Sequence, residues 1–257
     1  VSNLDCLDRD LDLGETGGVV SWTPPASAGR VILYRVYAST DFNGTDKVLW
    51  ADVPVGTNAA DLFDFPYRTR PVLLVYSKSA LAKQTTPVGL VQIDAQASVD
   101  NVSFTDLDLD EGELGGYLKW VAPIADFLVT RYMVYLANDT TGGGRVLQSA
   151  VDGSENNLTF AADSPSLNLT HLLIYTKSSF VEQSTPISFV LYDSAALVEN
   201  VSYIGRDLDL LQLGGVTAWN PPADSAQVVG YRVYLAEDST GTGRSQVGLE
   251  LPFGTNM

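Results

Sequence analysis

Residue types that build catalytic sites are scarce in this chain of 257 residues, which has one histidine, His171, and one cysteine, Cys6. A Ser-His-Asp set, a Cys-His set or a histidine metal cluster would each depend on that single histidine, which argues against all three. No disulfide can form within the chain, so cysteine pairing does not indicate a redox compartment. We expect Cys6 to fill a small apolar space, because Phe104 stands 98 residues later. The alternative is an intermolecular bridge.

Basic residues and long apolar runs are also scarce. The 15 Lys and Arg residues face 31 Asp and Glu residues, giving a net charge of −16 and a pI near 4.2. Nucleic acid is excluded as a partner, because its phosphates need Lys and Arg, and an anionic membrane surface is disfavoured. No apolar stretch approaches the length of a transmembrane helix, so we expect no membrane insertion. The first residue is Val1, and no signal peptide is present, so we expect a piece of a longer chain.

What the chain does contain is one unit that recurs almost three times. Its markers lie 98 and then 99 residues apart, which is the size of a small domain and too long for a solenoid repeat. We therefore expect repeats at residues 1–98 and 99–197 and a partial repeat at 198–257. The markers are Gly17–Gly18, Gly115–Gly116 and Gly214–Gly215, then Trp22, Trp120 and Trp219, and then Tyr34/Tyr37, Tyr132/Tyr135 and Tyr231/Tyr234.

The second repeat is complete and shows the pattern of short strands. Apolar and polar residues alternate, β-branched and aromatic residues are enriched, and turn residues separate the segments. No segment has a sustained helical period. We expect an all-β chain of tandem seven-stranded antiparallel sandwiches. The expected strands are 102–109, 117–120, 129–136, 145–149, 157–161, 171–178 and 186–192.

Two motifs give a resemblance to a known family. Ser21–Pro25 followed by Tyr34–Tyr37 resembles strands B and C of fibronectin type III domains, an immunoglobulin-like sandwich family, and the third repeat keeps both motifs. The resemblance implies core positions for Trp22, Trp120, Trp219, Tyr34, Tyr132 and Tyr231. The family's tyrosine corner is missing, which marks a divergent subfamily. The phrases Leu-Gly-Gly, Tyr-Leu-Ala and Gln-Ser/Thr-Thr-Pro are also similar to repeats in long surface proteins of algae and other protists.

The third repeat has material for four strands only, and half a sandwich leaves an apolar face and a strand edge uncovered. Three explanations are open. The parent chain continues, the fragment is disordered, or another chain completes the sheet by strand addition and so builds a filament.

Acidic runs occupy one position in every repeat. They consist of Asp8, Asp10 and Asp12; Asp106, Asp108 and Asp110; and Asp207 and Asp209. Carboxylates in such number suit Ca²⁺, and an ion at each domain junction would stiffen the array. The spacing is not that of an EF-hand. The alternative is a solvated acidic face on a first, edge strand, charged to prevent edge-to-edge pairing.

Six Asn-X-Ser/Thr triplets predict N-linked glycans and hence a secreted or cell-surface location. The alternative is that these residue types are simply common in loops. The triplets begin at Asn43, Asn101, Asn138, Asn157, Asn168 and Asn200.

These observations favour a non-enzymatic extracellular structural protein, whose sandwiches are spacers in a surface coat, appendage or filament. Its partners would be other copies of itself or other extracellular structural proteins, and no cofactor is required beyond the candidate Ca²⁺. The alternative is an adhesive or carbohydrate-binding module of a larger protein, with Trp50 as the candidate sugar platform. We expect Trp50 to pack against a sheet instead.

Overall fold

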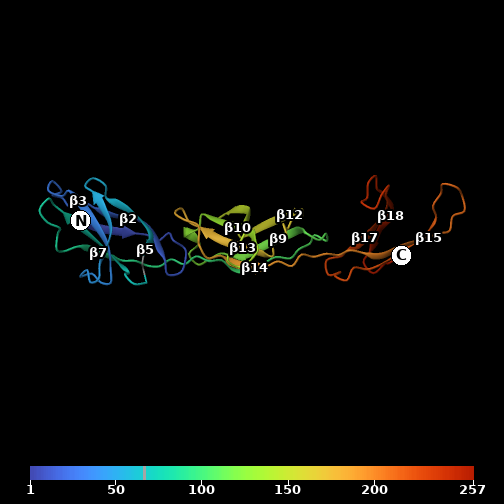
Figure 1. Ribbon diagram of the computed structural model, residues 1–257, viewed down its shortest axis with the longest axis horizontal. Coiled ribbons are helices and arrows are strands. Elements are labelled where there is room, and N and C mark those ends of the chain that lie inside the picture. Colours follow the sequence, from blue (N-terminus) through green and yellow to red (C-terminus); the bar gives the residue numbers. More distant parts are fainter. Residues whose placement is uncertain (66–67) are drawn as a thin grey trace. The chain divides into compact units, whose positions relative to one another are not determined.

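The computed structural model describes residues 1–65 and 68–257 (Figure 1). This part of the chain is all-β, and the one helical element is a short 3₁₀ turn, η1 (Asp126–Leu128). The prediction of antiparallel β-sandwiches with almost no helix is confirmed. Among the described residues, no helix has the length and apolar character needed to cross a membrane.

The chain divides into two compact units whose borders cut across the second repeat. The first unit comprises residues 1–103, 119–158 and 170–190, and the second comprises 104–118, 159–169 and 191–257. Each unit is described by itself below.

The first repeat, in the first unit, forms a sandwich of seven antiparallel strands. One sheet has the order β1-β2-β5 and the other has the order β4-β3-β6-β7. Strand β3 is central in its sheet, since it pairs with both β4 and β6. The strands are β1 (Ser2–Cys6), β2 (Thr16–Thr23), β3 (Leu33–Ser39), β4 (Val48–Pro54), β5 (Ala59–Phe65), β6 (Val72–Lys78) and β7 (Val88–Val91).

The second repeat has the same seven-stranded order, with sheets β12-β9-β8 and β11-β10-β13-β14. Strand β9 begins in the second unit and ends in the first, whereas β12 begins in the first and ends in the second. The strands are β8 (Asp100–Ser103), β9 (Glu113–Val121), β10 (Arg131–Ala137), β11 (Val146–Asp152), β12 (Asn157–Pro165), β13 (His171–Lys177) and β14 (Ile187–Val190).

An aromatic pair lies in the core of every repeat. Trp22 and Tyr34 are buried, and their rings meet edge to face with centroids 5.4 Å apart. Such a pair contributes about 0.5–1.5 kcal/mol beyond its area burial. Around the first pair pack the buried side chains Val20, Val36 and Leu62. The equivalent pairs are Trp120 with Tyr132, at 5.2 Å, and Trp219 with Tyr231, at 5.3 Å.

The glycine pair that marks each repeat is explained by a close approach of two backbone segments. Gly18 has φ +146°, and a Cβ there would lie 2.5 Å from the Leu7 carbonyl oxygen. Gly116 repeats this, with φ +139° and 2.4 Å to the Thr105 carbonyl oxygen. Only glycine fits at these positions. The approach brings the acidic run against the second strand of the repeat.

One expected strand is shorter than the sequence pattern predicts. The second repeat was expected to begin with a strand over 102–109, but β8 ends at Ser103, and the acidic run after it is a loop with one isolated bridge at Asp106. In the first repeat, Asp8 Oδ1 accepts the Asp10 N–H and Asp10 Oδ1 accepts the Asp12 N–H. Aspartates that bond the backbone two residues later replace the ladder with turns. Alternation of apolar and polar residues cannot reveal that competition.

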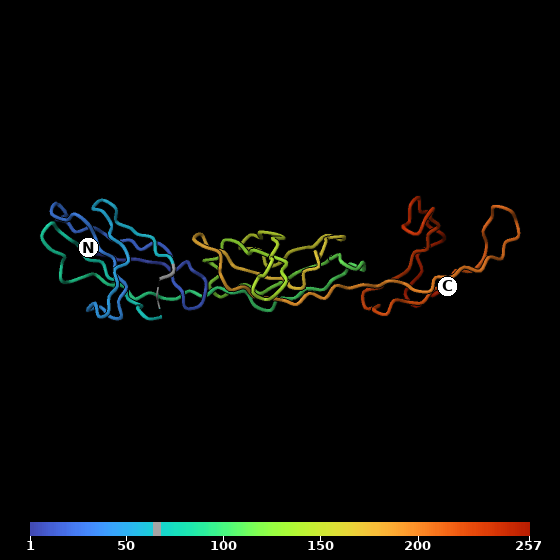
Figure 2. Tube along the Cα trace, viewed as in Figure 1, coloured from blue at the N-terminus to red at the C-terminus, as the bar shows by residue number. Residues whose placement is uncertain are grey.

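The third repeat, in the second unit, has four strands in two antiparallel hairpins. Strand β15 (Glu199–Gly205) pairs with β16 (Gly215–Asn220), and β17 (Gly230–Leu235) pairs with β18 (Ser245–Pro252). Figure 2 traces both hairpins in orange and red. Among the described residues, β17 has no counterpart of β6 on its other edge, whereas β3 is paired on both sides.

Candidate functional site

The acidic loops are the most specific polar feature of the described chain. In the first repeat Asp8, Asp10 and Asp12 are 3%, 6% and 4% exposed. The expectation of a solvated acidic face on an edge strand is therefore wrong for this run. Buried carboxylates need hydrogen-bond donors, so their partners define what the loops do.

The first carboxylate of the run ties three segments together. Asp8 accepts N–H bonds from Gly17 at 2.9 Å and from Ala95 at 2.7 Å, in addition to the bond from Asp10. Asp106 repeats the set one repeat later. It accepts bonds from the N–H groups of Asp108, Gly115 and Ser194. Each carboxylate thus joins its own loop, the glycine strand and the segment that leads to the next repeat.

The Asp8 carboxyl has an altered acidity. Burial raises its pKa from 3.8 to about 6, although the three N–H groups that it accepts favour the charged form. The third repeat has Gly205 at this position and so lacks the residue. Its loop keeps the local turn, in which the Asp209 N–H donates to Asp207 Oδ1 at 2.9 Å, and the backbone bond from the Arg206 N–H to the Gly214 carbonyl.

The third carboxylate of the first run joins the first repeat to the second. Asp12 accepts hydrogen bonds from the backbone N–H groups of Ser184 and Thr185 and from the Thr185 hydroxyl. Ser184 and Thr185 belong to the loop between β13 and β14. We call residues 178–185 the second tip loop. All of these residues lie in the first unit.

Backbone carbonyls of the acidic loop complete this junction. Gln183 Nε2 donates to the Leu11 carbonyl at 2.8 Å and to Ser98 Oγ at 2.9 Å. Ser178 Oγ donates to the Arg9 carbonyl at 2.6 Å. Gln183 and Ser178 are 3% and 2% exposed, so these bonds are shielded from water.

An apolar contact lies beside the polar one. Phe180 of the second tip loop stacks on Phe63 of β5, with ring centroids 4.7 Å apart and planes 22° apart. A Cβ added to Gly17 would lie 3.0 Å from the Phe180 ring. Leu11 is fully buried at the same junction. Hydrogen bonds therefore fix the direction of the junction, while apolar packing excludes water from it.

Two carboxylate groups have the geometry for a cation. Asp10, Asp12 and Glu15 form one, and Asp108, Asp110, Glu113 and Asp163 form the other, with one oxygen of each residue within 4.8 Å of the others in its group. Such oxygens suit Ca²⁺. In the first group the Asp12 oxygens already accept bonds from the tip loop. Calcium binding stays a prediction, and the second group is its better candidate.

The remaining single residues have structural surroundings. Cys6 is half-buried against the first core, and burial together with Asp8 and Asp5 raises the pKa of its thiol to about 11. Trp50 is half-buried and packs on the same core, as expected. His171 is half-buried on β13, and its Nδ1 lies 2.8 Å from the Thr170 hydroxyl.

The six asparagines of the glycosylation triplets are all exposed. Three of them adopt positive φ: Asn168 in a turn, and Asn101 and Asn200 where the pairing of β8 and β15 shifts register. Glycosylation stays a prediction, and the exposure leaves room for it.

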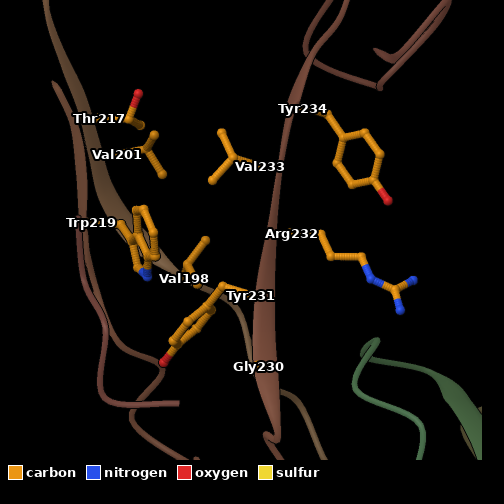
Figure 3. A pocket seen from close by; sticks show the side chains of 9 residues that line it. All are labelled: Val198, Val201, Thr217, Trp219, Gly230, Tyr231, Arg232, Val233 and Tyr234. Carbon is orange, nitrogen blue, oxygen red and sulfur yellow. The ribbon is translucent and has the colours of Figure 1, made fainter. Parts of the chain in front are cut away.

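The third repeat presents an open apolar face (Figure 3). Trp219, Tyr231, Val201 and Val233 point into the space between its two hairpins, while Arg232 and Tyr234 point away. This pocket has a volume of about 310 Å³. Val201 is 64% exposed. Trp219 and Tyr231, by contrast, are only 8% exposed, because they cover each other.

Sequence reasoning missed the second tip loop. Its signal was the phrase Gln-Ser/Thr-Thr-Pro, present at 84–87 and 183–186, whose hydroxyl and amide groups are the donors that an acidic loop needs.

Comparisons with known proteins give limited information. No protein-family model and no curated protein matches the chain. Among solved structures, the chain is similar to the crystal structure of chicken CNTN1 FN1-FN3 domains, with 16% identity and a TM-score of 0.33 over 75% of this chain and 67% of that one. That neighbour consists of fibronectin type III domains in tandem. The all-β sandwich class itself is evident from the sheets of this chain.

Proposed function

We propose that the chain is a non-enzymatic extracellular structural protein whose tandem sandwiches act as spacers in a surface coat, appendage or filament. The observation that carries the proposal is the junction of the first and second repeats. Asp12 and Leu11 of one repeat bind the second tip loop of the next through several hydrogen bonds, and the bond from Gln183 to the Leu11 carbonyl is shielded from water. A spacer needs junctions of this kind, because freely hinged domains would fold back on one another.

Surface charge and the candidate modifications are consistent with this role. A net charge of −16 keeps copies of a sandwich apart except where specific donors meet carboxylates. Glycans on the six exposed asparagines would coat the sides of the array, and Ca²⁺ at the Asp108 group would add stiffness.

Small-angle X-ray scattering of the full chain tests the proposal. A compact chain of this length would have a radius of gyration of about 18 Å. Three sandwiches end to end, each about 30 Å along its strands, would have about 27 Å. A value near 18 Å, or binding of the folded chain to a glycan array that is lost in Trp50→Ala, would favour the adhesive alternative.

A further inference from the structure

The first repeat carries a tip loop of its own, residues 79–86 between β6 and β7, which we call the first tip loop. It matches the second tip loop residue by residue. Ser79 corresponds to Ser178, Leu81 to Phe180, Gln84 to Gln183, Thr85 to Ser184 and Thr86 to Thr185.

The two tip loops have the same internal hydrogen bonds. The Ser79 N–H donates to the Ala82 carbonyl at 2.9 Å, as Ser178 does to Val181 at 3.0 Å. Gln84 N–H bonds the Ser77 carbonyl at 2.9 Å, which the second loop repeats with Gln183 and Thr176. The first tip loop therefore already has the conformation that binds an acidic loop, so docking requires no reordering of its backbone.

What differs is the exposure. Leu81 is 95% exposed, and Gln84, Thr85 and Thr86 are exposed too. Their counterpart Gln183 is 3% exposed. The Gln84 amide and the Leu81 side chain are thus open to solvent, whereas their counterparts Gln183 and Phe180 are buried and half-buried. The two threonines do not differ in this way, because Ser184 and Thr185 are exposed as well.

The charge around the first tip loop fits an acidic partner. A groove of about 300 Å³ is lined by Arg30, Lys78 and Lys83 together with Ser79 and Gln84. Three cations around one groove are unusual in a chain with 15 basic residues against 31 acidic ones. Such local complementarity speeds and orients association between molecules of the same net charge.

We propose that the first tip loop binds the acidic loop of the third repeat from a second copy of the chain. Leu208 and Asp209 are the counterparts of Leu11 and Asp12. Leu208 is 99% exposed, and Asp209 is exposed. The N–H groups of Thr85 and Thr86 donate to the Asp209 carboxylate, and Leu81 takes the place that Phe180 holds in the junction between the first two repeats.

The third repeat is a better partner than the second. Asp110 lies among three other carboxylates, those of Asp108, Glu113 and Asp163. Leu109 is half-buried, in contrast to Leu208. A contact between the tip loop of one copy and the acidic loop of another is heterologous, so its repetition gives a filament unless the rotation closes a ring. The inference rests on the proposed spacer function and names its assembly partner.

Cysteine cross-linking tests the contact in the full chain with Cys6→Ser as background. Thr85→Cys and Leu208→Cys in one chain keep the backbone N–H groups and the Asp209 carboxylate. They should give a ladder of disulfide-linked multimers under mild oxidation, since a disulfide requires the two Cα atoms to approach within about 7 Å. Leu249→Cys, at an exposed leucine outside the acidic loops, replaces Leu208→Cys in the control and should give none. An equal ladder in the control, no ladder at all, or a ladder only with Leu109→Cys would overturn the proposal.

Sedimentation of the uncross-linked chain gives an independent readout. We expect association that depends on concentration and weakens with salt, and that falls at least tenfold in Asp209→Asn and in Thr86→Val. A wild-type chain that stays monomeric at several hundred micromolar would refute the contact. The radius of gyration of the monomer separately tests the spacer function, so failure of one does not imply failure of the other.

Discussion

Replacing Asp12 by alanine should loosen the junction of the first and second repeats without unfolding either sandwich. The carboxylate accepts two N–H bonds and one hydroxyl bond from the second tip loop and belongs to no strand. In the second repeat its counterpart Asp110 is exposed. Asp110→Ala is therefore a matched control, because it removes the same charge and shortens the side chain by the same amount.

The magnitude follows from the bonds that are lost. Hydrogen bonds to a charged group contribute about 1.5–3 kcal/mol each, so three would suggest an upper bound of about 4.5–9 kcal/mol. Ser184 and Thr185 are exposed, and water can replace part of the carboxylate. We therefore expect Asp12→Ala to lower the free energy of unfolding by about 2–4 kcal/mol. Asp110→Ala should cost under about 0.5 kcal/mol.

Urea unfolding of the full chain measures the loss, and amide hydrogen exchange locates it. Exchange at the Ser184 and Thr185 N–H groups should accelerate in Asp12→Ala, while exchange in β13 and β10 should not change. Equal destabilisation by the two substitutions, or unchanged exchange at Ser184 and Thr185, would show that the carboxylate does not hold the junction together.

Three further predictions concern the glycine pair, pH and calcium. Gly116→Ala should lower the free energy of unfolding by about 2–4 kcal/mol, because the added Cβ would meet the Thr105 carbonyl oxygen. Gly112→Ala, where φ is +87° and no atom lies within 4 Å of the added Cβ, should lower it by about 1 kcal/mol. Similar losses for the two variants in chemical denaturation would contradict this reasoning. The folded-state pKa of Asp8 is about 6 against 3.8 for the free group, so its contribution to stability is present below pH 3.8 and is lost as the pH rises to about 6. Melting at pH 4, 5 and 6 should show that decline in the wild type and a flatter profile in Asp8→Asn, and equal profiles would exclude the effect. If the Asp108 group binds calcium, Ca²⁺ at ten times its dissociation constant should stabilise the folded chain by about 1.4 kcal/mol and raise the melting temperature by about 3–6 °C over a chelator. Asp163→Asn should reduce the rise, and no rise would leave the carboxylates with hydrogen bonding alone.

Much of the fold could be predicted from the sequence, because local patterns determine it. The segment 129–136, rich in β-branched and aromatic residues, became a strand, and the core positions that the family resemblance implied for Trp120 and Tyr132 gave a pair in edge contact. Strand ends were less predictable. The segment 102–109 alternates except at the polar pair Thr105–Asp106, yet the strand there is only Asp100–Ser103, because aspartates after it bond the backbone and end the ladder.

The candidate site could be predicted only in part. The repeated aspartates singled out the right loops, but not what they bind. The donors on Ser184 and Thr185 are 172 and 173 residues away from Asp12, and no pattern within one repeat connects them. Only a fold that brings the end of one repeat against the tip of the next places these groups together.

The position of the acidic run at the end of each repeat explains how an acidic array can hold together. Carboxylates on neighbouring domains repel, so a net charge of −16 by itself favours separation of the domains. At the junction the charge of Asp12 is directed at N–H donors, where water is partly excluded and the attraction is strongest. The same residue type therefore repels neighbouring surfaces and, at this junction, joins the first repeat to the second. Under the proposed spacer function, this distribution would favour an extended array over lateral clumping.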